Sequence, residues 1–368
     1  MVNNAMNNSG TLADNKIIFV TISMRGGGTE RVISLLADNW VSQGKSVDIM
    51  MIGDTAIEYE LDERVNVYSV SEATGGSIMG RVNRITQMRK IFKTNKNAVI
   101  IAMGTVAAMF ASVALTGLNR RFILSERNDP NRLNHRPIKS YEKAIRDILY
   151  KKADRIVFQT HMAEECFKDS LRKKGTIILN PLNIEHNETT EGSREQTIIT
   201  AGRLTQQKNH KLLIDAFEEF SQSHEDYKLL IFGKGELENE IQQYIEQKGL
   251  TGKALMKGFS DNIHHEFRTG GIYVSSSDWE GISNSLAEAM ACGIPVVATN
   301  CPMGGCAMLI QNEENGILIE PGDRAALVKA LEKLSTDSEY YAGISEAGKR
   351  ITQKLDIQKI AEEWEALF

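Results

Sequence analysis

The sequence alternates short β-rich apolar runs with amphipathic helical segments, and it does so in two successive series. The first series has predicted strands at 16–22, 46–52, 97–103, 120–126 and 154–160, and the second has them at 197–203, 227–233, 254–259, 271–277 and 294–299. Alternating β and α elements are typical of a parallel sheet with helices on both faces. The sequence therefore predicts an α/β protein with two doubly wound, Rossmann-like domains.

The length of the chain, 368 residues, also favours two domains, because a single hydrophobic core seldom grows beyond about 250–300 residues. A polar segment at 176–196 separates the two series and marks the predicted boundary. We expect an N-terminal domain at 1–182 and a C-terminal domain at 183–350. The last segment, 351–368, is predicted to contain an amphipathic helix that packs back on the first domain.

Charge is distributed unevenly along the chain. The formal net charge is -5, yet residues 70–180 carry 21 basic and 9 acidic side chains. Within this region, 81–97 combines basic residues with Ile85, Met88 and Phe92 at helical spacing, a pattern that suits an interfacial helix on anionic lipid. A solvated basic helix is the alternative. The charge would also suit nucleic acid, but no recognition motif is present, and we predict no nucleic-acid partner.

The sequence predicts neither a membrane-spanning helix nor a secretory signal. It has no run of about 18 apolar residues, and its first fifteen residues are polar. We expect a cytoplasmic protein that is peripheral on the inner face of the cell membrane. The cysteines lack the paired spacing of a metal site, so we expect reduced thiols at Cys166, Cys292, Cys301 and Cys306.

Three loops that follow predicted strands are candidate ligand sites, because doubly wound domains bind ligands at the carboxyl ends of their strands. The loop MRGGGTER (24–31) brings backbone N–H groups near a helix N-terminus, which suits a phosphate but also a plain tight turn. The loop AGRLTQQKNH (201–210) offers Arg203 and Lys208 to a diphosphate, or simply to solvent. The loop FGKGELENE (232–240) lacks the last glycine of a dinucleotide fingerprint, so it borders a nucleotide or forms a simple turn.

A fourth candidate is the stretch WEGISNSLAEAMACGIPVVATN (279–300), which places Glu280 and Glu288 around a Gly/Ser/Asn loop. Ser285 and Glu288 fit an S-x-x-E capping box, which would explain Glu288 but not Glu280. The free N–H groups at the helix start can receive phosphate oxygens, while Glu280 can accept hydrogen bonds from hydroxyls. We therefore predict that both glutamates flank one ligand.

The order GGGTER, AGRLTQQKN, GKGE, GFS and E-GISNSLA-E followed by MACGIPVVAT resembles glycosyltransferase family 4. This is a family of retaining, nucleotide-sugar-dependent enzymes with the GT-B fold, in which two Rossmann-like domains face a central cleft. The resemblance runs from about residue 16 to the end of the chain. It implies that Glu280 contacts the donor sugar, that Glu288 binds the ribose hydroxyls, and that Arg203 and Lys208 hold the diphosphate.

The resemblance also implies further donor contacts, from Gly27, Gly28, Gly233, Phe259, Ser260, Gly281, Ile282, Ser283 and Asn284. Many relatives carry a histidine where this chain has Arg127, which cannot act as a general base and would instead hold the sugar or an acceptor phosphate. No D-x-D motif is apparent, so we expect no required metal ion. Fixed cations would stabilise the leaving diphosphate, and one of its oxygens would take the acceptor proton during attack on the same face of the sugar.

The predicted function is transfer of a hexose or N-acetylhexosamine from a UDP-sugar to a polyprenyl-diphosphate-linked glycan acceptor in polysaccharide or glycan biosynthesis. UDP is preferred over GDP only because it is more frequent in the family. Two alternatives stay open. A UDP-sugar epimerase of the same fold would need acid/base residues beside the sugar that the sequence does not reveal. A non-catalytic sugar-nucleotide-binding subunit would have little reason to keep the acid pair and both cations intact.

Overall fold

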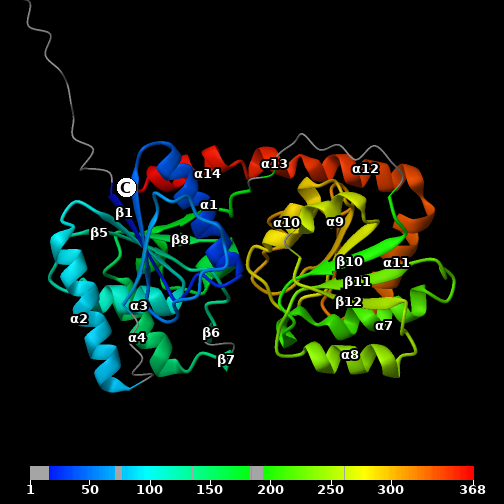
Figure 1. Ribbon diagram of the computed structural model, residues 1–368, viewed down its shortest axis with the longest axis horizontal. Coiled ribbons are helices and arrows are strands. Elements are labelled where there is room, and N and C mark those ends of the chain that lie inside the picture. Colours follow the sequence, from blue (N-terminus) through cyan, green and yellow to red (C-terminus); the bar gives the residue numbers. More distant parts are fainter. Residues whose placement is uncertain (1–15, 71–76, 134–135, 183, 185–193, 261) are drawn as a thin grey trace, which may run out of the picture. The chain divides into compact units, whose positions relative to one another are not determined.

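The computed structural model describes residues 16–70, 77–133, 136–182, 184, 194–260 and 262–368. The chain divides into two compact units (Figure 1). Unit 1 runs through Phe158 and includes Phe167–Thr176 and Ala361–Phe368, and unit 2 consists of Gln159–Cys166 and Ile177–Ile360. Much of the predicted boundary segment, 176–196, lies outside the described residues.

Unit 1 contains a seven-stranded sheet in the order β3-β2-β1-β4-β5-β8-β9. All neighbouring pairs from β3 to β8 are parallel. The inner strands are buried along almost their whole length, which explains why they read as continuous apolar runs. The strands of unit 1, including a separate antiparallel pair β6–β7, are β1 Lys16–Thr21, β2 Ser46–Met51, β3 Asn66–Ser69, β4 Val99–Met103, β5 Arg121–Ser125, β6 Arg132–Leu133, β7 Arg136–Pro137, β8 Arg155–Phe158 and β9 Gly175–Ile177.

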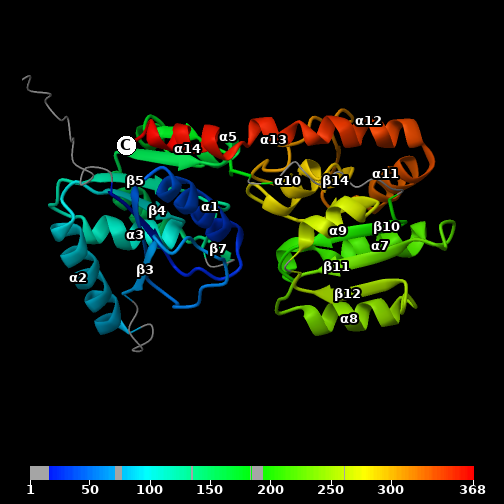
Figure 2. The ribbon, with the colours of Figure 1, turned by 45° about the horizontal axis from the view of Figure 1, so that its top comes forward.

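Helices cover both faces of this sheet (Figures 1 and 2). Helices α1 and α14 lie on one side, and α2, α3 and α4 lie on the other. The end of the chain is fixed to α1, because Trp40 Nε1 donates to Glu365 Oε1 at 2.8 Å and the Trp40 ring packs edge-on against Phe368. The helices are α1 Gly28–Ser42, α2 Ile78–Thr94, α3 Thr105–Ala114, α4 Ser140–Tyr150, α6 Asp169–Arg172 and α14 Ile357–Glu365.

Unit 2 contains a six-stranded parallel sheet in the order β12-β11-β10-β13-β14-β15. Helices α7 and α8 lie on one side, and α9 and α10 on the other. The chain starts at the centre with β10, moves outward to β12 and then returns to the other side of β10, which creates a switch point between β10 and β13. The elements are β10 Thr197–Ala201, β11 Lys228–Phe232, β12 Ala254–Gly258, β13 Ile272–Ser275, β14 Val296–Thr299, β15 Ile317–Ile319, α5 His161–Glu165, α7 His210–Phe220, α8 Glu238–Gln247, α9 Ile263–Thr269, α10 Asn284–Ala291, α11 Arg324–Thr336, α12 Ser338–Lys349 and α13 Ile351–Lys354.

This strand order is that of the Rossmann fold, in which ligands bind beyond the carboxyl ends of the strands at the switch point. The prediction of two doubly wound, Rossmann-like domains is confirmed. Within the described parts of the chain, no helix is both long and apolar enough to cross a bilayer.

Two details of the sequence reading are wrong. Helix α10 is capped by Ser283, whose hydroxyl accepts from the Leu286 N–H, so Ser285 and Glu288 form no capping box. In α2, the face expected to meet lipid packs into the core of unit 1, since Met88 and Phe92 are fully buried. The apolar periodicity of α2 therefore reflects the protein interior.

Candidate functional site

The candidate site of unit 2 lies on the loops that follow β10 and β13. These strands are parallel neighbours on either side of the switch point, so their loops leave the same edge of the sheet side by side. Several hydrogen bonds join the loops. The Asp278 N–H donates to Gln207 O at 2.9 Å, Asn209 Nδ2 donates to Asp278 Oδ1 at 2.7 Å, and Ser276 Oγ donates to Lys208 O at 2.9 Å. The two loops therefore form one connected surface.

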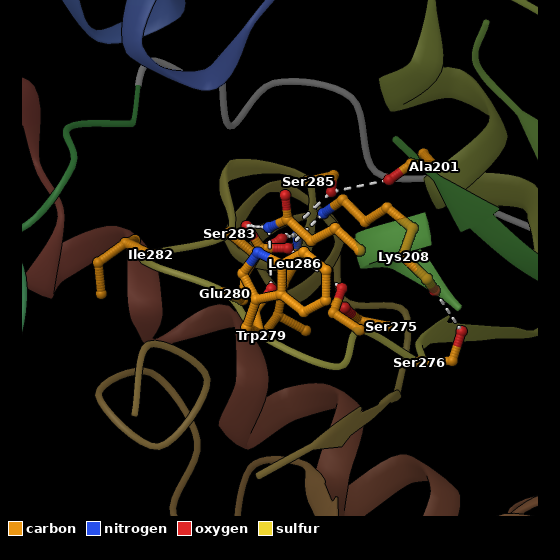
Figure 3. A network of polar contacts seen from close by, with 12 residues as sticks. Ala201, Lys208, Ser275, Ser276, Trp279, Glu280, Ile282, Ser283, Ser285 and Leu286 are labelled. Atoms are coloured by element: carbon orange, nitrogen blue, oxygen red, sulfur yellow. Dashed lines mark hydrogen bonds and ion pairs between the residues drawn. The ribbon is translucent and has the colours of Figure 1, made fainter. Parts of the chain in front are cut away.

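Glu280 and Lys208 form an ion pair at the centre of this surface (Figure 3). Lys208 Nζ lies 2.5 Å from Glu280 Oε2, and Ser277 Oγ donates to the same oxygen at 3.1 Å. Gln207 Nε2 lies 3.3 Å from Glu280 Oε1 and donates to Trp279 O at 2.8 Å. Both carboxylate oxygens thus have donors, while 13% of the Glu280 side chain and 17% of the Lys208 side chain stay exposed to solvent. The pair is held in place yet accessible.

Glycines let neighbouring loops approach this pair closely. A Cβ on Gly233, whose φ is +130°, would lie 1.9 Å from Gly202 O, so the loop after β11 is pressed against the loop that carries Arg203. A Cβ on Gly305 would lie only 1.7 Å from Gly281 O. The loop at 301–306 therefore supports the backbone next to Glu280 from behind, and no side chain fits between them.

The other predicted residues of unit 2 surround the pair in different states of exposure. Arg203 is exposed, and its guanidinium has no hydrogen-bond or ion-pair partner among the described residues. Phe259 is 56% exposed, and Ser260 follows it on the same loop. Glu288 is mostly buried on α10, with Oε2 at 3.8 Å from His264 Nε2 on α9. These positions leave a cation and an aromatic ring open to a ligand.

The stretch from Gly281 to Asn284 is more rigid than its composition suggested. Ile282 and Ser283 are buried, and the Ser283 hydroxyl is used as the helix cap. The Asn284 amide oxygen accepts from Asn180 Nδ2 at 2.5 Å, and Asn180 in turn accepts from Gln159. Ser285 Oγ donates to Ala201 O at 3.0 Å, which ties α10 to the end of β10 (Figure 3). Ile282 and Ser283 therefore have only their backbone groups to offer a ligand.

Unit 1 brings its three predicted residues to the carboxyl ends of β1 and β5. Gly27 caps α1, which begins at Gly28, and a Cβ on Gly27 would lie 2.3 Å from Glu30 Oε2. The neighbouring Gly26 N–H donates to Glu58 Oε2 at 2.8 Å. Two carboxylates thus lie at this glycine loop, where the resemblance implies a diphosphate.

Arg127 is almost completely buried, and its Nη1 lies 3.5 Å from Ser125 Oγ. Burial lowers the pKa of Arg127 to about 10, and the charges of Glu30 and Glu126 oppose this effect. Arg127 therefore stays a cation at neutral pH and belongs to the same electrostatic cluster as the glycine loop.

Sequence reasoning missed Gln207 and Ser277, which hold the Glu280 carboxylate. The signal for Gln207 was its position between the two predicted cations, and Ser277 stands in the run SSSDWE. It also missed that the Cys301 and Cys306 thiols, both buried, hydrogen-bond to each other near Glu280, an interaction that lowers the pKa of Cys301. All four cysteines are free. The described residues contain no group of three or more His, Cys, Asp or Glu side chains that could hold a metal ion.

The two Rossmann-like units form a GT-B fold, as in the solved glycosyltransferase structures that this chain resembles. Residues 183–351 match the family model described as "Glycosyl transferases group 1". An uncharacterized glycosyltransferase of Haemophilus influenzae is 25% identical over 343 residues, which cover 93% of this chain and 96% of that protein.

A second relative is the GalNAc-alpha-(1->4)-GalNAc-alpha-(1->3)-diNAcBac-PP-undecaprenol alpha-1,4-N-acetyl-D-galactosaminyltransferase of Campylobacter jejuni. It is 23% identical over 356 residues, which cover 95% of this chain and 97% of that protein. The crystal structure of Anabaena HepE in complex with UDP and glucose superposes with a TM-score of 0.81 at 18% identity and covers 95% of this chain and 98% of HepE. Together, these matches support a glycosyltransferase.

Proposed function

We propose that the chain is a retaining glycosyltransferase of family 4 that transfers a hexose or N-acetylhexosamine from a UDP-sugar to a polyprenyl-diphosphate-linked glycan. The observation that carries this proposal is the Lys208–Glu280 pair at the switch point of unit 2, with the exposed Arg203 on the same loop. The Campylobacter jejuni relative, a transferase acting on an undecaprenyl-diphosphate-linked glycan, supports the acceptor class. The complex of HepE with UDP supports the donor class.

In this proposal, Arg203 and Lys208 bind the diphosphate of the donor. Arg203 is free to turn toward a ligand, and Lys208 lies in the loop between β10 and α7. Negative charge grows on the diphosphate as the glycosidic bond breaks, and cations that are already in place stabilise it without a large rearrangement. We therefore predict that Arg203 and Lys208, and not a metal ion, stabilise the leaving diphosphate in this chain.

Glu280 binds the donor sugar, and Glu288 binds the ribose. Glu280 Oε1 has only a 3.3 Å contact with Gln207, so it can accept a hydrogen bond from a sugar hydroxyl. Glu288 on α10 and Phe259 after β12 would hold the nucleoside, and Gly281–Asn284 would offer backbone N–H groups. The acceptor proton passes to the leaving diphosphate, since Arg127 cannot serve as a base.

Unit 1 supplies the acceptor side of the reaction. It would also supply Gly27 and Gly28 to the donor diphosphate, and Arg127 to the sugar or to an acceptor phosphate. We assign this domain to 1–182, the donor domain to 183–350 and the C-terminal segment to 351–368. The protein would act in the cytoplasm, at the inner face of the cell membrane, where a polyprenyl-linked acceptor is available.

The test is release of nucleoside diphosphate from a panel of UDP- and GDP-sugars, with and without polyprenyl-diphosphate-linked saccharides. Wild type is compared with Glu280→Gln and with Glu246→Gln, an exposed control in α8. Acceptor-dependent release that is lost only in Glu280→Gln supports the proposal. Conversion of the donor sugar without release would indicate an epimerase, and tight nucleotide binding without turnover would indicate a binding subunit.

A further inference from the structure

Helix α4 turns its apolar face to solvent. Tyr141, Ile145 and Ile148 are 59%, 47% and 62% exposed, and Ala144 between them is exposed as well. These four residues stand at positions i, i+3, i+4 and i+7, so they form a single stripe, here named the α4 stripe. A surface helix of a soluble protein normally buries such a stripe against its own core.

The opposite side of α4 is buried and polar, which fixes the rotation of the helix. Arg146 is fully buried, donates to Pro130 O at 2.5 Å and pairs with Asp147 at 2.8 Å. Its guanidinium also lies 4.3 Å from the centre of the Phe167 ring. Turning the α4 stripe inward would break the Arg146–Pro130 hydrogen bond and carry the Arg146–Asp147 pair out of the interior, because both partners of that pair lie on α4.

A second buried hydrogen bond also fixes the rotation of α4. The Tyr150 hydroxyl donates to Glu126 Oε2 at 2.8 Å, and both residues are buried. The exposure of the α4 stripe is thus a consequence of what the helix must bury on its other side.

The surroundings of the α4 stripe are positive. Residues 136–152, which contain the helix, carry six basic and two acidic side chains. Both acids are already paired, Glu142 with Arg136 and Asp147 with Arg146. Exposed lysines remain at both ends of the helix, at Lys139 and Lys151, whereas the Lys152 ammonium donates to Ser112 O and Thr116 Oγ1.

We propose that the α4 stripe docks unit 1 on an anionic membrane surface. Two isoleucines and a tyrosine would enter the boundary between headgroups and acyl chains, and the lysines at the helix ends would meet lipid phosphates. The positive rim favours this occupant over a second copy of the chain, which would bring the same positive rim against it. The use of such docking, to reach a lipid-linked acceptor, rests on the proposed function, but the docking itself does not.

The experiment is flotation of the full-length protein with vesicles of phosphatidylcholine alone and of phosphatidylcholine with phosphatidylglycerol. Wild type should bind the anionic vesicles only. The double variant Ile145→Ser/Ile148→Ser should bind them about tenfold more weakly or worse, because two apolar side chains no longer leave water. Ile145→Leu/Ile148→Leu keeps the apolar area and should bind like wild type.

A second comparison asks whether the helix matters or only exposed apolar area. Ile78 and Met79 at the start of α2 are 81% and 77% exposed, so Ile78→Ser/Met79→Ser removes even more exposed apolar area from the same unit. This variant should keep vesicle binding. Loss of binding here, with binding retained in the α4 serine variant, would overturn the proposal in favour of α2.

Two other results would also overturn it. One is equal binding by wild type and the α4 serine variant. The other is a dimer in size-exclusion chromatography that disappears in the serine variant while vesicle binding is absent in both, which would make a second copy the occupant. Vesicle binding needs no donor sugar, so its failure is read separately from failure of nucleoside diphosphate release, and unchanged thermal unfolding shows that the variants fold.

Discussion

Replacing Gly305 with alanine should displace the loop that carries Glu280. The new Cβ would lie 1.7 Å from Gly281 O and 2.3 Å from Gly281 C, whereas real Cβ contacts are essentially never shorter than 3.0 Å. The φ of Gly305 lies outside the left-handed region, so the backbone itself accepts alanine and the contact is the whole perturbation. Both partners are backbone, so neither can turn aside as a flexible side chain would.

The displacement reaches the site because Gly281 directly follows Glu280. The gap must widen from 1.7 Å to at least 3.0 Å, and a shift of about 1 Å at a reacting centre can lower a rate by about a hundredfold. We expect transfer to fall by about that factor. Overpacking of this kind typically reduces the free energy of unfolding by about 1–3 kcal/mol, so the protein should still fold.

The measurements are initial rates of nucleoside diphosphate release and thermal unfolding of the same samples. Gly343→Ala is the matched control, because Gly343 lies inside α12 in the same unit and a Cβ there meets nothing within 4 Å. It should transfer like wild type and unfold at a slightly higher temperature, since alanine favours helix. Wild-type transfer by Gly305→Ala would refute the reasoning. A Gly305→Ala protein that does not fold would also refute the reasoning, because the loss of transfer would then come from unfolding and not from a displaced loop.

Three further predictions concern neighbouring residues. Gln207→Leu removes the donor to Trp279 O and the contact with Glu280, so kcat should fall about tenfold with little change in KM; a rise in KM alone would argue against a positioning role. Arg203→Ala should weaken nucleoside diphosphate much more than nucleoside in calorimetry, and equal losses would place the diphosphate elsewhere. Burial lowers the pKa of His210 to about 4, and the Lys208 charge adds to this. The unfolded chain takes up a proton near pH 6.5 and the folded chain only near pH 4, so stability should fall by roughly 3 kcal/mol as the pH drops through this window. Unfolding at pH 7 and pH 4.5 should therefore differ more in wild type than in His210→Leu, and identical pH dependence in the two proteins would exclude His210 as the cause.

The sequence predicted the central strands well because a strand that is buried on both faces is a continuous apolar run. Strands such as β1, β10 and β11 are apolar along nearly their full length, and their predicted ranges match to within two residues. The strands β3, β9 and β15 went unnoticed. They are only three or four residues long and lie at or beside the sheet edges, so neither length nor alternation distinguishes them from loops.

The candidate site was predicted in part, because motif order identifies the charged residues but not the neutral ones that hold them. Gln207 and Glu280 are 73 positions apart, and only the pairing of β10 with β13 brings their loops together. The prediction of the α10 cap was wrong for a related reason. Ser283 and Ser285 are both plausible caps by sequence, but Ser285 is drawn to Ala201 O and the Tyr273 hydroxyl, partners that belong to other elements.

Helices α2 and α4 show why a periodic apolar pattern cannot by itself identify a membrane face. The period reports that a helix has an apolar side, and in α2 that side packs into the core, with Met88 and Phe92 fully buried. In α4 the same kind of pattern faces water, because Arg146 and Tyr150 on the other side satisfy partners inside unit 1. The residues on the other face of the helix decide whether its apolar face is buried or exposed. The Arg146 guanidinium and the Tyr150 hydroxyl have buried partners that only this rotation of the helix provides. The apolar side chains of the α4 stripe stay in contact with water, which is unfavourable, and docking on a lipid surface would remove that contact.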